Sequence, residues 1–301
     1  MSTYAITGKS IIVTGAAGGI GSATTRALVA RGARVTLVDL AQDSVDEVAD
    51  TLPSDRVLAL AADVTSAEQM TAAVDATVEH FGRLDVVFAN AGIINDPPTT
   101  FAAADLDAYE KVIEVDLLGV VRTIKPALPQ IIRNRGHVLI TASVYAFFNG
   151  AVNSAYASSK AAVEMLGRSL RVELASEGAS AGVLYPGWVA TPIADSTRGA
   201  NKTVTQLKQR AFPGPLGTYV PPEQIADAVI TGIETRAARI IEPKRWSPLS
   251  AMRGAINILA DRHLERDQET QRLIKCVDAD ERQRHARRET TRQPRSAAGA
   301  G

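Results

Sequence analysis

Short apolar runs alternate with longer amphipathic stretches along the first 245 residues of the chain. The apolar runs are rich in Val, Ile and Leu, which suits strands buried on both faces of a parallel sheet. They predict strands near 10–14, 34–39, 57–62, 85–89, 137–142, 180–185 and 239–242. Helical periodicity predicts helices at about 20–31, 43–51, 67–81, 105–133, 154–177 and 222–235. This alternation indicates a single doubly wound α/β (Rossmann-type) domain with a mostly parallel seven-stranded sheet over residues 1–245.

Two further segments follow this domain. Leu249, Met252, Ile256 and Leu259 recur at helical spacing, so residues 246–277 are expected to form a helical extension. Its apolar face is expected to dock on the chain's own body or on a neighbouring subunit, with attachment to a membrane surface as the alternative. Residues 278–301 are rich in arginine and poor in large apolar side chains, and they are expected to be a disordered, solvated tail.

Composition narrows the function classes. Lys+Arg and Asp+Glu both number 33, so no net field favours nucleic acid or an anionic membrane. The single cysteine, Cys276, fits a reducing, cytoplasmic compartment. The four histidines lack metal-ligand spacing, so no metal is expected. No apolar run approaches the ~18 residues of a membrane span, which predicts no integral membrane segment.

A glycine-rich turn follows the first strand. The apolar run Ile11–Val13 leads into Gly15, Gly19 and Gly21, where a helix is expected to begin. Glycines let a phosphate approach the main chain, and the N–H groups and dipole at a helix start attract anions. The turn therefore predicts a dinucleotide site, the alternative being an ordinary strand–turn–helix corner.

Asp39 ends the second predicted strand, eighteen residues after Gly21. A dinucleotide fold places an acid there to hold the adenosine ribose hydroxyls. Asp39 would repel a 2′-phosphate, and neither Leu40 nor the turn residues Ala16 and Ala17 supply a cation. We therefore predict NAD rather than NADP as cofactor; the alternative is that Asp39 is a solvated strand-end residue.

Tyr156 and Lys160 lie four residues apart, with Ser143 thirteen residues before the tyrosine. In a helix this spacing places the phenol and the ammonium on one face. A nearby cation favours the phenolate, so Lys160 is expected to lower the pKa of Tyr156 from about 10 towards neutrality. A phenol tuned in this way can serve as a general acid or base.

Together these segments resemble the short-chain dehydrogenase/reductase family over roughly residues 7–245. The motifs are Thr14–Gly21, Asp63-Val64, Asn90-Ala91-Gly92, the trio Ser143, Tyr156 and Lys160, and Pro186-Gly187 with Val189 and Thr191. The resemblance implies a homo-oligomer, tetramer or dimer, and an alcohol dehydrogenase or ketone reductase in which Ser143, Tyr156 and Lys160 are catalytic. Its implied cofactor-binding residues are Gly15, Gly19, Ile20, Gly21, Asp39, Leu40, Asp63, Val64, Asn90, Ala91, Gly92, Tyr156, Lys160, Pro186, Gly187, Val189 and Thr191.

One position departs from the family pattern. The family usually carries an asparagine where this chain has Asp116, and that asparagine helps to hold a water linking the lysine to solvent. A carboxylate can accept hydrogen bonds from the same groups, so Asp116 is counted with the catalytic residues. It would also partly cancel the charge of Lys160 and raise the pKa of Tyr156. The alternative is that Asp116 lies on the helix surface.

The substrate is expected to be a hydrophobic secondary alcohol or its ketone. Family position suggests pocket residues Ile94, Val144, Tyr145, Phe147, Phe148, Asn153, Tyr185 and Trp188, and a loop with a short helical pair over 193–221 that closes on the substrate. Each aromatic residue could instead be part of the core. The alternatives for function are a 3-oxoacyl or hydroxysteroid-type reductase and a non-catalytic dinucleotide-sensing regulator.

Overall fold

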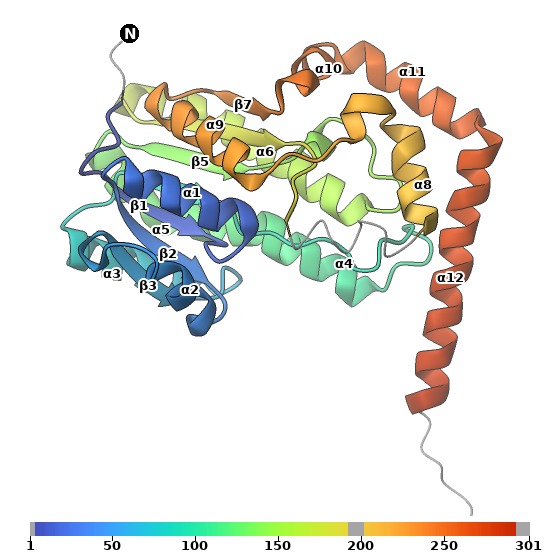
Figure 1. Ribbon diagram of the computed structural model, residues 1–301, viewed down its shortest axis with the longest axis horizontal. Coiled ribbons are helices and arrows are strands. Elements are labelled where there is room, and N and C mark those ends of the chain that lie inside the picture. Colours follow the sequence, from blue (N-terminus) through green and yellow to red (C-terminus); the bar gives the residue numbers. More distant parts are fainter. Residues whose placement is uncertain (1–3, 192–201, 293–301) are drawn as a thin grey trace, which may run out of the picture.

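The computed structural model describes residues 4–191 and 202–292 and shows a parallel sheet with helices on both faces (Figure 1). Seven strands lie in the order β3-β2-β1-β4-β5-β6-β7, and every pairing is parallel. The strands are β1 Ser10–Thr14, β2 Arg34–Asp39, β3 Val57–Ala61, β4 Val86–Ala89, β5 His137–Thr141, β6 Ser180–Pro186 and β7 Arg239–Glu242. The predicted fold class is confirmed, and each strand boundary differs from the prediction by no more than one residue.

The helices occupy the predicted intervals and continue beyond them. They are α1 Gly19–Ala30, α2 Gln42–Ala49, α3 Ala67–Phe81, α4 Leu106–Ile113, α5 Gly119–Arg133, α6 Ser154–Glu173, α8 Lys202–Ala211, α9 Pro222–Glu234, α10 Ser247–Ala251, α11 Arg253–Arg266 and α12 Gln268–Arg292. The single helix expected over 105–133 is divided by a π-helical turn, Glu114–Leu118. Such turns insert an extra residue into a helix and often occur at functional sites, and apolar periodicity does not reveal them.

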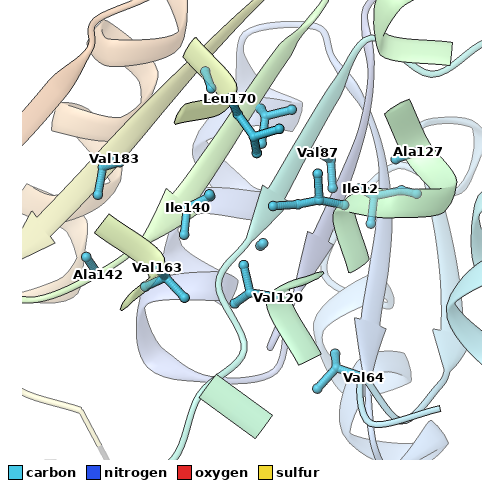
Figure 2. Packing of buried hydrophobic residues seen from close by; sticks show 14 of the residues in the cluster. Ile12, Val64, Val87, Val120, Ala127, Ile140, Ala142, Val163, Leu170 and Val183 are labelled. Carbon is cyan, nitrogen blue, oxygen red and sulfur yellow. The ribbon is translucent and has the colours of Figure 1, made fainter. Parts of the chain in front are cut away.

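Alternation along the strands supplies two cores. In β1, Ile12 packs into one hydrophobic cluster, whereas Ile11 and Val13 pack into the other, because successive side chains of a strand point to opposite faces. Helices α3, α5 and α6 cover the Ile12 face, where Figure 2 shows Val163 and Leu170 of α6 among the strand residues. Helices α1, α2 and α9 cover the other face.

All parallel strands end at the same edge, and this edge collects the residues singled out in the sequence. Gly15 follows β1, Asp39 ends β2, Asn90 follows β4 and Ser143 comes shortly after β5. The chain crosses to opposite sides of β1 on its way to β2 and to β4, so the sheet has its topological switch point here. Open α/β sheets bind ligands in the crevice at such a point.

The C-terminal segments differ from expectation. Of the predicted docking face, Leu249 packs against the core, whereas Met252 and Leu259 are 59% and 67% exposed. Helix α12 packs against α8, and it continues to Arg292 although disorder was expected from Asp278 onward. Arginine–carboxylate pairs one turn apart, such as Arg284 with Glu281 at 3.1 Å, stabilise a helix that has few apolar residues. Residues 293–301 of the expected tail lie outside the described residues.

Within the two described ranges, no helix combines the length and the apolar character needed to cross a membrane.

Candidate functional site

A pocket of about 610 Å³ lies at the carboxyl edge of the sheet. It is lined by residues that follow six of the strands, from the glycine turn after β1 to Pro186 at the end of β6. Every predicted cofactor-binding residue borders it, namely Gly15, Gly19, Ile20, Gly21, Asp39, Leu40, Asp63, Val64, Asn90, Ala91, Gly92, Tyr156, Lys160, Pro186, Gly187, Val189 and Thr191. Ser143 borders it as well, whereas Asp116 is buried behind Lys160.

Only glycine fits at key positions of the turn between β1 and α1. Gly15 has φ +65°, and a Cβ on it would lie 2.9 Å from the Ala91 Cα. A Cβ on Gly21 would lie 2.0 Å from the Gly15 carbonyl oxygen, and one on Gly19 would lie 2.5 Å from the Thr191 Cγ2. The turn is therefore packed as closely as the backbone allows, and it brings the N-terminus of α1 to the pocket.

Asp39 is held at the end of β2 by two backbone donors. The Ala17 N–H donates to Asp39 Oδ2 at 2.9 Å, and the Leu40 N–H donates to Oδ1 at 2.8 Å. The side chain therefore lies against the glycine turn and borders the pocket, instead of extending into solvent. Beside it the lining residues Ala17, Leu40 and Ser44 carry no positive charge.

Asn90 ties three strand ends together. Its Nδ2 donates to the Thr14 carbonyl at 3.1 Å, and its Oδ1 accepts from the Thr141 hydroxyl at 3.0 Å. The Thr14 hydroxyl in turn accepts from the N–H groups of Asn90 and Ala91 at 3.0 and 3.1 Å. This network fixes the ends of β1, β4 and β5 relative to one another beneath the pocket.

Asp63 stabilises its own turn after β3. Its Oδ1 accepts from the backbone N–H and from the hydroxyl of Thr65, both at 2.8 Å. The turn leads into α3, which is capped by the Ser66 hydroxyl accepting from the Gln69 N–H at 3.3 Å. The carboxylate is thereby kept at the pocket wall.

Ser143, Tyr156 and Lys160 meet at the same wall. Ser143 follows β5, and Tyr156 and Lys160 lie one turn apart on α6. The Lys160 Nζ lies 5.3 Å from the centre of the Tyr156 ring and donates to the Thr141 carbonyl at 3.3 Å. Hydrogen bonding by Ser143 favours the ionised form of the Tyr156 phenol and so lowers its pKa. The sequence spacing therefore does bring a hydroxyl, a phenol and an ammonium together.

Asp116 makes a buried ion pair with Lys160. Its Oδ2 lies 3.0 Å from the Lys160 Nζ, and the two side chains are 0% and 2% exposed. Its Oδ1 accepts from the Ile93 N–H at 2.7 Å. A Cβ on Gly92 would lie within 3.3 Å of both charged groups, so the backbone encloses the pair on that side. The alternative that Asp116 is a helix-surface residue is wrong.

The pKa of Tyr156 lies above its ordinary value of 10.0, which corrects the expectation of a lowered value. Burial raises this pKa most, and the Asp116 carboxylate raises it further, whereas Lys160 and Ser143 lower it. Burial likewise raises the pKa of Asp116, against the influence of Lys160. Burial alone would lower the pKa of Lys160, but the charge of Asp116 raises it. The expectation from sequence counted the lysine and the opposing carboxylate but left out burial, which has the largest effect on this pKa.

The predicted substrate residues divide into two groups. Ile94, Val144, Tyr145, Asn153 and Trp188 line the pocket. Phe147, Phe148 and Tyr185 do not, so their prediction as pocket residues is wrong: Phe147 packs on Tyr185 at 5.7 Å between ring centres, and Phe148 packs on Trp246 at 5.6 Å. Their place in the core follows from the geometry of the strand and the turn that carry them. Their residue type alone does not show whether the side chains face the core or the pocket.

Several lining residues belong to no recognisable sequence motif. Val152 precedes α6, and Val204 and Lys208 lie on α8, within the segment 193–221 that was expected to close on the substrate. Residues 193–201 of that segment lie outside the described residues, whereas 202–221 form α8 and a 3₁₀ turn, Gly214–Gly217. The helical spacing of Val204, Leu207 and Lys208 was the available signal, and it was too short to be decisive.

Among the described residues, no three His, Cys, Asp or Glu side chains gather in an arrangement that could hold a metal ion.

The strand order and the pocket at the switch point define a protein of the Rossmann class. Residues 9–202 match the model of the short chain dehydrogenase family, and the chain belongs to that family.

Characterised relatives are similar over most of the chain. Cis-4-hydroxycyclohexanecarboxylate dehydrogenase from Sinomonas cyclohexanicum is 35% identical over 221 residues, which cover 72% of this chain and 86% of the relative. 2-(R)-hydroxypropyl-CoM dehydrogenase from Xanthobacter autotrophicus is 33% identical over 73% of this chain and 88% of that protein.

Solved structures share the fold. The crystal structure of levodione reductase superposes with a TM-score of 0.71 at 28% identity, over 78% of this chain and 96% of that one. A short-chain dehydrogenase/reductase from Burkholderia phymatum, solved in complex with NAD, gives a TM-score of 0.73 at 23% identity, over 85% and 96% of the two chains. At that identity the likeness concerns the fold alone.

Proposed function

We propose that this protein is an NAD-dependent oxidoreductase that interconverts a hydrophobic secondary alcohol and its ketone. The observation that carries the proposal is the meeting of Ser143, Tyr156 and Lys160 in the same pocket as the glycine turn and Asp39. Strands β2 and β5, which place Asp39 and Ser143, are separated by β1 and β4. Three inter-strand spacings amount to about 14 Å, a span that an extended dinucleotide can bridge.

The residues present fit such a cofactor. The close-packed glycine turn leaves room beside the N-terminus of α1 for a pyrophosphate, and Asp39 faces the pocket where a ribose would lie. Bound NAD would supply the hydride acceptor, and the protein would orient it and control the proton.

Tyr156 is proposed as the group that moves the proton. Its phenol takes the hydroxyl proton of the alcohol during oxidation and returns a proton to the carbonyl oxygen during reduction. Ser143 holds the substrate oxygen, where negative charge develops in the transition state. Lys160 would hold the nicotinamide ribose and keeps a positive charge beside the phenol, and Asp116 holds Lys160 in place.

The raised pKa of Tyr156 gives the reaction a preferred protonation state. At neutral pH the phenol is protonated, which suits it to donate a proton to a ketone. Alcohol oxidation needs the phenolate, so its rate is expected to increase with pH through the alkaline range.

Six lining side chains around the substrate end are apolar or aromatic, namely Ile94, Val144, Tyr145, Val152, Trp188 and Val204. Such a surface favours a hydrophobic substrate. The name of the relative from Sinomonas cyclohexanicum identifies a ring-bearing secondary alcohol as that protein's substrate, which supports starting with cyclic alcohols and ketones. The buried Asn153 provides a polar contact within this end of the pocket.

The test is the oxidation of NADH by a panel of ketones, followed by fluorescence, with Tyr156→Phe as the decisive variant. Loss of the proton donor should lower kcat by about 10²- to 10⁴-fold and leave NADH binding unchanged. Tyr109→Phe, which removes a phenol outside the pocket lining, is the matched control. Turnover of Tyr156→Phe at the wild-type rate would overturn the assignment.

The cofactor choice is tested separately by comparing kcat/KM for NADH and NADPH. We expect a preference for NADH of at least about tenfold, because a 2′-phosphate beside Asp39 would meet a carboxylate with no cation next to it. Asp39→Ser combined with Leu40→Arg should reduce or reverse the preference. A wild-type preference for NADPH would contradict the proposal for NAD while leaving the proton chemistry intact.

A further inference from the structure

Helix α8 forms part of the substrate end of the pocket, yet much of its support comes from the C-terminal helix α12. Figure 1 shows α12 running beside α8. Val204 and Lys208 of α8 line the pocket, and Lys208 lies over the ring of Trp188 at 3.9 Å. The position of α8 therefore decides the shape of the wall that a substrate would meet.

An apolar seam joins the two helices. Val204 and Leu207 of α8 are each 7% exposed, and Leu273 and Val277 of α12 are each 2% exposed within the same cluster. Val204 belongs both to this seam and to the pocket lining, so a change in packing at the seam would move a side chain of the pocket surface.

The seam also supports a strained residue of the pocket wall. Val152 packs against this cluster, lines the pocket and has φ +62°. A β-branched residue in the left-handed region is costly and persists only where its surroundings fix it. Its neighbour Asn153 also borders the pocket, directly before the helix that carries Tyr156.

Polar contacts tie the same wall to the extension. The Arg210 guanidinium of α8 contacts Asp267 through Nε at 2.9 Å and Nη2 at 2.6 Å. Asp267 also caps α12 by accepting from the Thr270 N–H at 2.9 Å. The Thr100 hydroxyl, two residues after the lining residue Pro98, donates to Asp278 of α12.

We propose that α12 is the positioning element of the substrate wall: it holds α8 and the Val152 turn in the arrangement that fits the substrate. The inference rests on the proposed oxidoreductase function and adds to it a role for the C-terminal extension. The glycine turn and Asp39 make none of these contacts, so α12 should affect substrate binding and leave cofactor binding alone.

The experiment uses the full chain with Leu273→Ala. Loosening the wall should raise KM for the ketone about 10- to 100-fold, because small misplacements of positioning groups have effects of that size. The dissociation constant of NADH should not change. Leu259→Ala is the matched control, since it makes the same deletion in the extension at a side chain that is 67% exposed. Leu273→Met conserves the volume of the side chain, so this variant should have the wild-type KM.

A second readout does not depend on turnover. The chain has two tryptophans, and Trp246 is 0% exposed, so acrylamide quenching of fluorescence reports on Trp188. Release of α8 should increase the quenching in Leu273→Ala and not in Leu259→Ala. Asp267→Asn is a second variant for the case that Leu273→Ala folds poorly. It keeps a side chain that can cap α12 and weakens the pair with Arg210. It should therefore raise KM and the quenching as Leu273→Ala does, but to a smaller extent.

The outcomes separate the two proposals. If the wild type is active and Leu273→Ala loses thermal stability with unchanged KM and unchanged quenching, α12 only stabilises the fold and the inference is wrong. If the wild type binds no NADH and reduces no ketone, the proposed function fails, while the quenching comparison still decides whether α12 holds α8.

Discussion

Asp116 gives this site its individual chemistry. Burying two charges is costly unless each is paired and hydrogen-bonded, and here the carboxylate meets both the Lys160 ammonium and the Ile93 N–H. The π-helical turn aims Asp116 inward, where regular helical spacing alone would not identify its partner. The sequence shows that residue 116 is an aspartate and predicts that Asp116 raises the pKa of Tyr156. Only the structure shows that burial raises this pKa more than Asp116 does.

Replacing Asp116 with asparagine should shift the pH dependence of the reaction to lower pH. The carboxylate raises the pKa of Tyr156, so its removal lowers that pKa, and the phenolate forms at lower pH. The rising limb for alcohol oxidation and the falling limb for ketone reduction should therefore both move down, with activity retained. The measurement is kcat/KM against pH in both directions.

The matched control for this charge removal is Glu114→Gln. Glu114 lies in the same π-helical turn but pairs with Arg122 at the surface, at 2.5 Å. Glu114→Gln should leave the pH profile unchanged. An Asp116→Asn profile that superposes on the wild type would show that Asp116 has no influence on the proton-transfer group.

Among the elements, the strand–turn–helix unit around the first strand was the most predictable from sequence. Its apolar run and its three glycines specify both the local structure and the reason for it, since a Cβ on Gly21 would lie 2.0 Å from a backbone oxygen. The break in the helix over 105–133 was not predictable, because a single inserted residue leaves the apolar pattern almost unchanged. The sequence also did not predict that residues 278–292 form part of helix α12. This helix is stabilised by paired charges and by a narrow row of buried apolar residues, and it lacks a broad apolar face.

Gly21→Ala tests this unit. Because the clash is with backbone and not with a flexible side chain, the turn must shift, which should cost about 1–3 kcal/mol of unfolding free energy and weaken NADH binding. Gly254→Ala is the control, since a Cβ there meets nothing within 4 Å and should stabilise α11 by up to about 1 kcal/mol. Urea unfolding and NADH titration measure both effects. Equal stability of the two variants would show that the turn tolerates a side chain.

For the molecule as a whole, the sequence predicted the end of the pocket beside the glycine turn better than the end beside α8. Asp39, Asn90 and Tyr156 lie next to strand ends or in short motifs, so their neighbours follow from the parallel sheet. The other end is lined by Val152 and by residues of α8, which packs against α12; these segments are distant in sequence and meet only through tertiary packing. Phe147 and Tyr185 illustrate the same limit, because residue type alone does not show which aromatic side chains face a cavity and which fill the core.

The buried Asp116–Lys160 pair also fixes the electrical balance of the reaction centre. The two charges cancel, so ionisation of the Tyr156 phenol would leave one uncompensated negative charge inside the protein. Under the proposed function, the oxidised nicotinamide ring carries a positive charge and the reduced ring carries none. Proton acceptance by the phenol and hydride acceptance by the cofactor are therefore thermodynamically linked: the positive ring of the oxidised cofactor would lower the pKa of Tyr156 and favour the phenolate, and reduction of the ring would raise that pKa again.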